Sequence, residues 1–126
     1  LVDDYGHHPT EVQVTLAAAK ELASSRGGQL MVIFQPHRYS RLKTLWAEFT
    51  QAFNEADRTV ITDVYPAGET PIPGADGVSL SQAIGAEFVP KTDWSALPQQ
   101  LLAEARPGDV LISMGAGGIT QLWRQY

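Results

Sequence analysis

Hydrophobic positions along this chain follow two alternating patterns, helical spacing in some segments and short continuous runs in others. In residues 10–25 the apolar side chains recur every three or four positions, which predicts a helix with one buried face and with Thr10 as its cap. Residues 30–34 are all apolar and rich in strand-forming types, which is typical of a strand buried on both faces. The residues expected on the buried helix face are Val12, Leu16, Ala19 and Leu22.

The alternation continues to the end of the chain. A second helix is expected over residues 40–54, with an apolar face made of Leu42, Leu45, Trp46, Phe49 and Phe53. Residues 66–74 are rich in Pro and Gly and should form a long loop. Strands that alternate with helices predict an α/β fold, an open and mostly parallel sheet with helices on both faces. The other predicted elements are a strand that ends at residue 4, strands over 58–62, 87–89 and 109–114, and helices over 79–84, 93–105 and 119–126.

Composition narrows the class of protein. The 126 residues are 44% hydrophobic, which is enough apolar material for a single folded domain over residues 1–126. The net charge of −5 excludes a broad basic surface for nucleic acid or anionic membranes, so an anion site would need a local cluster of Arg and His. The absence of Cys excludes disulfides, a thiolate nucleophile and Cys-bound zinc, and it fits a cytoplasmic protein.

The beginning of the chain is unusual for a complete protein. Leu1 is not Met, and it enters a predicted strand at once, so we expect the chain to be a fragment of a longer protein. No apolar run approaches the length that is needed to span a membrane.

Polar loops follow the carboxyl ends of four predicted strands, over residues 3–9, 35–41, 63–69 and 115–118. The carboxyl ends of parallel strands share one edge of the sheet, where ligands of open α/β sheets bind. Loops are polar in any α/β protein, but this concentration of His and Arg favours a functional site at that edge. The first two loops contain all three histidines of the chain, His7, His8 and His37.

Two arginines are the strongest candidates for binding an anion. Arg38 and Arg41 lie three positions apart at the start of a predicted helix, so both can face one ligand. Guanidinium groups match carboxylate or phosphate, and the free N–H groups of the helix N-terminus would add positive charge. Two solvated surface arginines are the alternative. Asp4 could accept hydrogen bonds from ribose hydroxyls, hold a metal, or only favour a helix N-terminus.

The remaining loop residues give weaker signals. His7 could donate to a phosphate oxygen or exchange a proton with an amine near neutral pH, whereas His8 fits a structural role equally well. Gly115 and Gly117 would let backbone N–H groups approach an anion. They match neither a dinucleotide fingerprint, since Thr120 stands where a third small residue is wanted, nor a Walker phosphate loop, since no Lys-Ser/Thr pair follows the glycines. The chain also has no Ser-His-Asp order with a nucleophile elbow.

Three polar motifs of the chain resemble the C-terminal domain of the Mur ligase family. They are Asp-Asp-Tyr-Gly-His-His-Pro-Thr-Glu at residues 3–11, Phe-Gln-Pro-His-Arg-Tyr-Ser-Arg at 34–41 and Asp-Val-Tyr-Pro-Ala-Gly-Glu at 63–69. The resemblance is collinear, continues through Pro-Ile-Pro-Gly-Ala-Asp at 71–76 and covers essentially the whole chain. It implies a Rossmann-like domain that closes over ATP and receives the amino acid in a three-domain cytoplasmic enzyme of peptidoglycan synthesis.

The resemblance also implies an activity. Within the family the motifs are most similar to the ligases that add L-alanine to UDP-N-acetylmuramate with ATP and Mg²⁺, and the murein-tripeptide recycling ligases come second. The other two domains would carry the UDP-sugar site and the ATP phosphate loop. We therefore expect the isolated domain to be inactive and to hold no cofactor tightly.

By the same resemblance, individual residues acquire roles. Asp4 would reach the ATP ribose, and His7 would face the ATP phosphates and the reaction centre as the catalytic candidate. Arg38 and Arg41 would hold the L-alanine carboxylate and nearby phosphate charge, with no residue assigned to a metal. Weaker candidates for the amino-acid and phosphate pocket are Tyr5, His37, Tyr65, Gly115 and Gly117.

Two other classes of protein stay open at this point. A stand-alone anion- or nucleotide-binding module would be favoured by a start codon immediately before Leu1. A metal-dependent hydrolase would need stoichiometric metal, and adjacent histidines give poor ligand spacing. The hydrolase would use His7, His8, His37, Asp3 and Asp4.

Overall fold

The computed structural model describes residues 2–4, 8–90 and 97–115. In chain order the elements are β1 Val2–Asp4, α1 Pro9–Ser25, β2 Leu30–Gln35, α2 Tyr39–Thr44, α3 Trp46–Gln51, β3 Arg58–Thr62, α4 Gly77–Ile84, β4 Glu87–Val89, α5 Leu97–Glu104 and β5 Val110–Gly115. The predicted strands thus agree with the structure to within one residue at each described end. Of the two helices expected near the end of the chain, the first is α5, seen from Leu97 onward, and residues 119–126 lie outside the described part.

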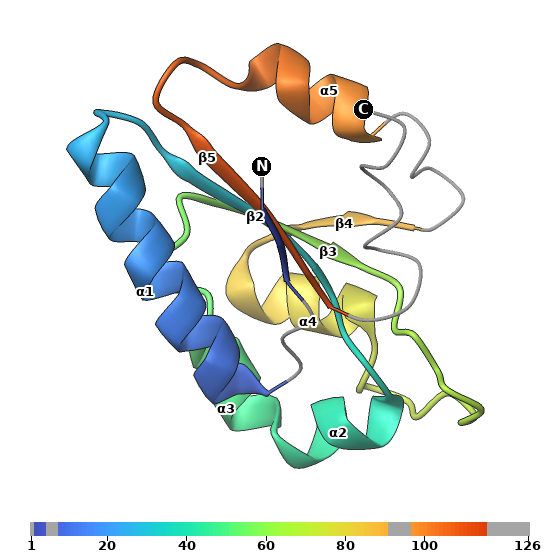
Figure 1. Ribbon diagram of the computed structural model, residues 1–126. Helices are drawn as coiled ribbons and strands as arrows, with labels where there is room; N and C mark the ends of the chain where they lie inside the picture. The colour runs from blue at the N-terminus through green and yellow to red at the C-terminus, as the bar shows by residue number, and fades with distance from the viewer. Residues whose placement is uncertain (1, 5–7, 91–96, 116–126) are drawn as a thin grey trace.

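The five strands form one sheet in the order β1-β5-β2-β3-β4, and every strand pair is parallel. The chain crosses the sheet in one direction from β1 to β4 and then returns to β5. Because crossovers between parallel strands are right-handed, the return connection must place its helix on the opposite face. Accordingly α1 to α4 cover one face and α5 covers the other (Figure 1). The predicted α/β fold with helices on both faces is confirmed.

Two hydrophobic clusters sit on the two faces of the sheet. Alternate residues of β2 enter each of them, since successive side chains of a strand point to opposite faces. Phe34 lies in the larger cluster, where its ring centroid is 5.7 Å from that of Phe49 and 5.1 Å from that of Phe53. On the other face Ile33 packs in a smaller cluster with Leu101 of α5. All six residues of β2 are buried, as its apolar run predicted.

The start of α1 corrects one expectation. The helix is capped by His8, whose Nδ1 accepts a hydrogen bond of 3.1 Å from the backbone N–H of Thr10, so Thr10 is not the cap. Pro9 occupies the first helical position, where its missing N–H costs nothing and its φ is already helical. The prediction that Leu22 lies on the buried face is also wrong, because Leu22 is 44% exposed and Ala23 is buried instead.

The helix predicted over residues 40–54 is two short helices. The backbone leaves helical geometry at Leu45, with φ −107° and ψ 23°, and α2 and α3 meet there at an angle (Figure 1). Leu42 of α2 and Phe49 of α3 are both buried in the larger cluster. Packing of the two halves against the sheet therefore overrides a sequence pattern that is continuously helical.

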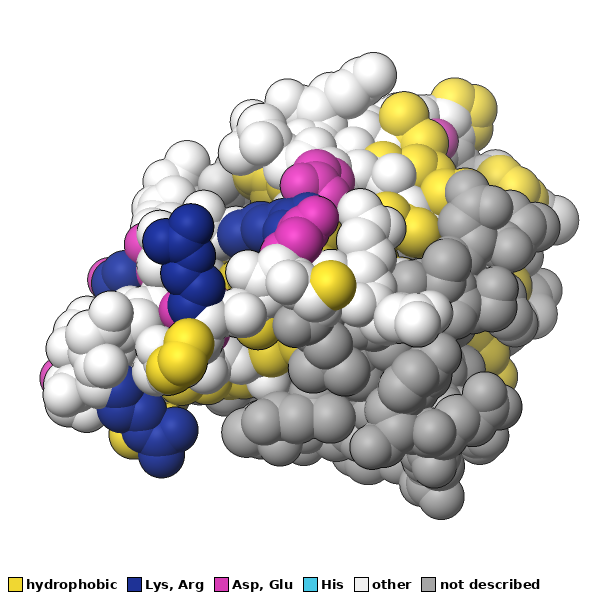
Figure 2. All heavy atoms as spheres, turned by 90° about the horizontal axis from the view of Figure 1, so that it is seen from above, with side chains coloured by type: hydrophobic (Ala, Val, Ile, Leu, Met, Phe, Trp, Pro, Cys, Tyr) yellow, Lys and Arg dark blue, Asp and Glu magenta, His cyan; other side chains and the backbone are white. Residues whose placement is uncertain are grey.

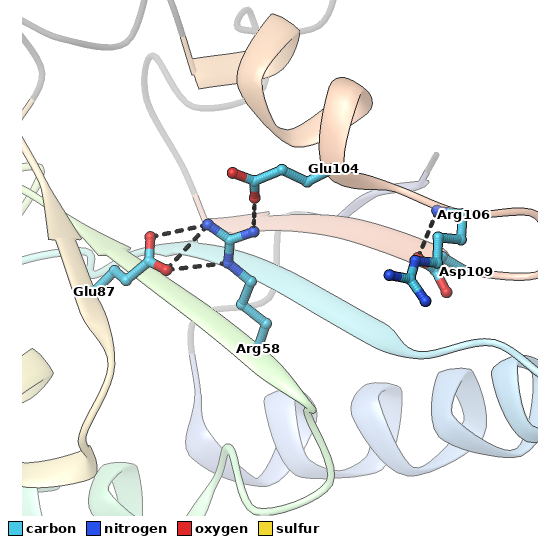
Figure 3. A network of polar contacts seen from close by, with 5 residues as sticks. All are labelled: Arg58, Glu87, Glu104, Arg106 and Asp109. Carbon is cyan, nitrogen blue, oxygen red and sulfur yellow. Dashed lines mark hydrogen bonds and ion pairs between the residues drawn. The ribbon is translucent and has the colours of Figure 1, made fainter.

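Charged side chains fasten the amino-terminal edge of the sheet. Arg58 at the start of β3 forms ion pairs with Glu87 at the start of β4, at 3.0 Å, and with Glu104 at the end of α5 (Figure 3). The carboxylate of Asp109 accepts hydrogen bonds of 2.8 Å from the backbone N–H groups of Gln29 and Arg106. Seen from the side of α5, acidic and basic side chains meet on the surface (Figure 2). These contacts tie α5 and the first residues of several strands together.

A fourth carboxylate, that of Asp57, acts at the same edge. Asp57, just before β3, accepts hydrogen bonds of 2.7 Å from the Lys20 ammonium of α1 and from the backbone N–H of Leu30. The pKa of Asp57 is lowered, first by the hydrogen bond from Lys20 and then by the one from Leu30. Helix α1 is thereby joined to the sheet by a charge pair as well as by its apolar face.

Candidate functional site

The strands bring the predicted loops to one edge of the sheet. Asp4, the last residue of β1, is paired with Met114 of β5, and Met114 is paired with Phe34 of β2. Phe34 is paired in turn with Ile61 of β3, so four strands end together. Because all of these strands are parallel, the segments that follow them begin at the same edge. The predicted gathering of the loops after β1, β2, β3 and β5 is confirmed at the level of the backbone.

Two of these loops are hydrogen-bonded to each other. The backbone N–H of Tyr65 donates to the carbonyl of Pro36, and the N–H of Arg38 donates to the carbonyl of Tyr65, both at 2.8 Å. Residues His37 and Tyr65 form an isolated parallel bridge, and their rings stack with centroids 5.5 Å apart and an interplanar angle of 9°. The loops after β2 and β3 thus form one unit that contains three of the predicted site residues.

A carboxylate from the second loop closes the start of α2. Glu69 accepts a hydrogen bond of 3.0 Å from the backbone N–H of Ser40 and one of 2.5 Å from the Ser40 hydroxyl. The pKa of Glu69 is lowered, chiefly by these hydrogen bonds from Ser40 and, to a smaller extent, by the backbone of Tyr39 and the charge of Arg38. The expectation that the helix N-terminus offers free N–H groups to a ligand is therefore wrong at Ser40, because Glu69 already binds that group.

Backbone strain is concentrated in the same unit. Within the described residues, Arg38 at φ 70° and Ala67 at φ 51° are the two residues other than glycine with a positive φ. Such conformations are rare for residues that carry a Cβ, and they persist only where surrounding contacts hold them. Arg38 lies in the loop after β2, and Ala67 lies in the tight turn closed by the 3.0 Å hydrogen bond from Glu69 N–H to the Pro66 carbonyl.

The two arginines lie on this unit, one on each side of its contact with Glu69. Arg38 immediately precedes α2 and is exposed, whereas Arg41 lies in the first turn of α2 and is half-buried. Neither guanidinium forms an ion pair within the part of the chain that the structure describes. They contrast with Arg58, whose charge is matched by two carboxylates at the opposite edge. The arrangement can attract an anion that approaches the carboxyl-terminal edge.

Gly115 has a structural reason to be glycine. It ends β5 with φ 133°, paired with Gln35 of β2, and a Cβ at this position would lie 2.5 Å from the Gln35 carbonyl oxygen. The close approach of the two strands requires glycine whether or not an anion binds. A role of Gly115 in anion binding stays a prediction.

The remaining site candidates fall mostly outside the described residues. Tyr5, His7 and Gly117 lie outside them, and for Asp4 the structure gives the backbone at the end of β1. His8, which the hydrolase alternative used as a ligand, caps α1 instead. The described residues contain no group of three or more His, Asp or Glu side chains that could hold a metal ion.

Two hollows of the surface lie at the other edge of the sheet, with volumes of about 410 and 480 Å³, and Arg58 lines both. The carboxylates around Arg58 and the carboxylate of Asp109 are already engaged in the contacts of Figure 3. A charged ligand would have to displace these contacts, so we locate the functional site at the carboxyl-terminal edge rather than in the larger hollows.

Comparison with known families agrees with this fold. The family model described as "Mur ligase, glutamate ligase domain" matches residues 1–117. The chain belongs to the Mur ligase family. The match spans the strands of the sheet and all three polar motifs, so the described part of the Mur ligase domain includes the joined loops after β2 and β3.

Relatives of this Mur ligase domain are named UDP-N-acetylmuramate–L-alanine ligase. The protein from Mycobacterium bovis is 49% identical over 123 residues, which cover 97% of this chain and 25% of the relative. That from Acidothermus cellulolyticus is 49% identical over 121 residues, with 94% of this chain and 25% of the relative covered. That from Nitratidesulfovibrio vulgaris is 44% identical over 136 residues, covering 100% and 28%. The chain thus spans about a quarter of the length of these relatives.

Solved structures share the fold of the Mur ligase domain. A domain from Haemophilus ducreyi, assigned to a UDP-N-acetylmuramate:L-alanyl-γ-D-glutamyl-meso-diaminopimelate ligase, has a TM-score of 0.64 and 17% identity, covering 98% of this chain and 84% of that one. A murein peptide ligase from Psychrobacter arcticus has a TM-score of 0.61 and 19% identity, covering 97% and 25%. At these identities the likeness shows the fold alone.

The hydrogen bonds between Glu69 and Ser40 were not predicted from the sequence. Glu69 and Ser40 were part of the quoted motifs, but neither was given a role. They lie 29 positions apart, and no local spacing rule joins residues at that separation. The signal that could have pointed to Glu69 is its place after Pro-Ala-Gly, since Pro and Gly indicate a tight turn there.

Proposed function

We propose that this chain is the amino-acid-binding and ATP-closing domain of a ligase that joins L-alanine to UDP-N-acetylmuramate in peptidoglycan synthesis. The observation that carries the proposal is the 49% identity, over 97% of the chain, to a ligase of that name. The likeness to the murein peptide ligase is only 19% in identity, so it gives no comparable support to a recycling function.

The joined loops after β2 and β3 are proposed to bind the amino acid. Arg41 and Arg38 hold the carboxylate of L-alanine and the phosphate charge beside it, because guanidinium groups bind both anions with paired hydrogen bonds. The stacked rings of His37 and Tyr65 are proposed to line this amino-acid site. In this role the domain binds and orients the amine for attack, and it adds fixed positive charge where anionic groups meet.

ATP and Mg²⁺ belong to the proposal for the complete ligase. ATP supplies the phosphoryl group that activates the carboxylate of the sugar. We propose that Asp4 reaches the ribose and that His7 faces the phosphates, with Gly115 and Gly117 near the same charges. The described residues form no cluster of metal-binding side chains, so no metal-binding role is proposed for them.

The setting proposed for the ligase is the cytoplasm, where its nucleotide-linked substrates are made. Among the described residues no helix combines the length and apolar character needed to cross a bilayer. Because the ATP phosphate loop and the sugar site are proposed to lie in other domains, we propose that this domain by itself is inactive and binds ATP and L-alanine weakly.

The test is the substitution Arg41→Ala in the complete ligase. Loss of one charged hydrogen-bonding partner should raise the KM for L-alanine roughly 10- to 100-fold. The KM for UDP-N-acetylmuramate should change little, since the sugar binds elsewhere. Steady-state kinetics with each substrate varied in turn measures both constants.

Lys43→Ala provides the matched control. Lys43 is a basic residue of the same helix, it is exposed, and it forms no ion pair within the described residues. Its removal should leave both constants near those of the unmodified ligase. If Arg41→Ala leaves the KM for L-alanine unchanged, or if Lys43→Ala raises it equally, the assignment of this loop to the amino acid is wrong.

A further inference from the structure

The side chain of Glu69, in the loop after β3, is hydrogen-bonded to Ser40, which follows the loop after β2. Its carboxylate binds both polar groups of Ser40, the backbone N–H at 3.0 Å and the hydroxyl at 2.5 Å. Ser40 stands between the two arginines of the proposed anion site. By holding Ser40 at two points, Glu69 therefore also holds the backbone segment that carries Arg38 and Arg41.

The strained residues are arranged around this connection. Arg38, two residues before Ser40, is held at φ 70°, and its N–H and carbonyl are both engaged, with Tyr65 and Leu42 respectively. Glu69 ends a tight turn that contains Ala67 at φ 51°. Unfavourable backbone conformations at both ends of one contact indicate that the contact is maintained against a cost.

The charge of Glu69 also bears on the site. The charge of Arg38 contributes to the lowered pKa of Glu69, but neither Arg38 nor Arg41 forms an ion pair within the described residues. Both carboxylate oxygens are instead directed to Ser40. Both oxygens of Glu69 are thus hydrogen-bonded to Ser40, and the two guanidinium groups have no ion-pair partner among the described residues.

From this geometry we infer that Glu69 is a positioning residue, which sets the place of Arg38 and Arg41 by clamping Ser40 and so determines the affinity for the amino-acid carboxylate. The inference rests on the proposed function. It assigns to Glu69 no contact with substrate and no proton transfer.

The experiment uses the complete ligase and four forms: unmodified, Glu69→Gln, Arg41→Ala and the double variant. Glu69→Gln keeps the size of the side chain but replaces one acceptor oxygen by a donor and removes the charge. Displacement of the arginines should raise the KM for L-alanine roughly 10-fold, with a smaller change in kcat. In the double variant the second substitution should add little, because residues that act through one another are not additive.

A merely structural role for Glu69 predicts a different result. General loosening of the domain would lower the thermal midpoint and add its full effect on top of Arg41→Ala. Either full additivity or an unchanged KM in Glu69→Gln overturns the inference. If Arg41→Ala itself has no effect on L-alanine, the failure lies with the proposed function of the loop and not with Glu69 alone.

Two further variants keep the test decisive if Glu69→Gln folds poorly. Ser40→Ala removes the hydroxyl end of the clamp and should raise the KM for L-alanine, whereas Ser40→Thr keeps a hydroxyl and should raise it less. Glu48→Gln, an exposed carboxylate in the first turn of α3, is the control for loss of a negative charge nearby. Equal effects of Ser40→Ala and Ser40→Thr would also overturn the inference.

Discussion

Substitution of Gly115 by Ala tests how closely β5 and β2 approach each other at the edge proposed to carry the site. A Cβ at this position would lie 2.5 Å from the carbonyl oxygen of Gln35 and 3.1 Å from its Cβ, well inside normal contact. The partner is backbone in the centre of the sheet, so it cannot rotate away as a flexible side chain could. Relief requires the end of β5 to move, and overpacking of this kind costs about 1–3 kcal/mol.

Backbone strain adds to the clash. Gly115 has φ 133°, a conformation that residues with a Cβ rarely adopt and that costs them about 1–3 kcal/mol. The two contributions predict a loss of about 2–6 kcal/mol in the free energy of unfolding. Since domains are stable by only about 5–15 kcal/mol, such a loss is a large part of the total.

Gly27→Ala separates the two contributions. Gly27 also has a positive φ, 71°, but a Cβ there would meet nothing within 4 Å. This control should lose only the strain of a left-handed residue, about 1–2 kcal/mol. Urea unfolding of both variants, followed by circular dichroism, gives the two losses, provided that the slope m stays unchanged. Equal losses in the two variants would refute the close approach that the argument assumes.

Two further predictions concern the charged contacts at the opposite edge. Because its partners lower the folded-state pKa of Asp57, this carboxylate stabilises the fold at pH values above its unfolded pKa and loses that contribution as the pH falls through the folded pKa. Asp57→Asn should therefore make the urea midpoint depend less on pH between about pH 5 and 2. Glu55→Gln, which changes an exposed neighbouring carboxylate, is the control. The same pH dependence in Asp57→Asn and in the unmodified domain would contradict this reasoning. Arg58→Met should lower the urea midpoint, and the difference from the unmodified domain should shrink in 1 M NaCl because exposed ion pairs are screened. Arg26→Met removes an exposed cation that has no ion pair among the described residues, so a salt dependence of equal size there would count against the prediction.

The sheet could be predicted because its information is local. Residues 30–34 form an unbroken apolar run, and only a strand buried on both faces accommodates such a run with helices on either side. The placement of α5 on the face opposite α1 to α4 was not predicted, since it follows from the return of the chain to β5 between β1 and β2. Strand order is a property of long-range pairing, and the periodicity of a single segment carries no trace of it.

The candidate site was predictable in location but less so in detail. The motifs placed His37, Arg38 and Tyr65 in loops at one edge, and the structure joins these three residues. The break at Leu45, the cap at His8 and the clamp by Glu69 were missed. Each of them depends on which of several competing partners a group finds in three dimensions, and local propensity ranks those partners too weakly to decide.

The two edges of the sheet differ in a way that connects stability with function. The ion pairs of the described residues, those of Lys20 with Asp57 and of Arg58 with two glutamates, all lie toward the amino-terminal edge. The two strained residues other than glycine lie at the carboxyl-terminal edge, where the cations have no ion-pair partner in the described part. A ligand site needs groups whose best partner is absent until the ligand arrives, and such groups do not stabilise the free protein. In the described residues, the ion pairs that stabilise the fold and the charges proposed to bind a ligand therefore lie at opposite edges of the sheet.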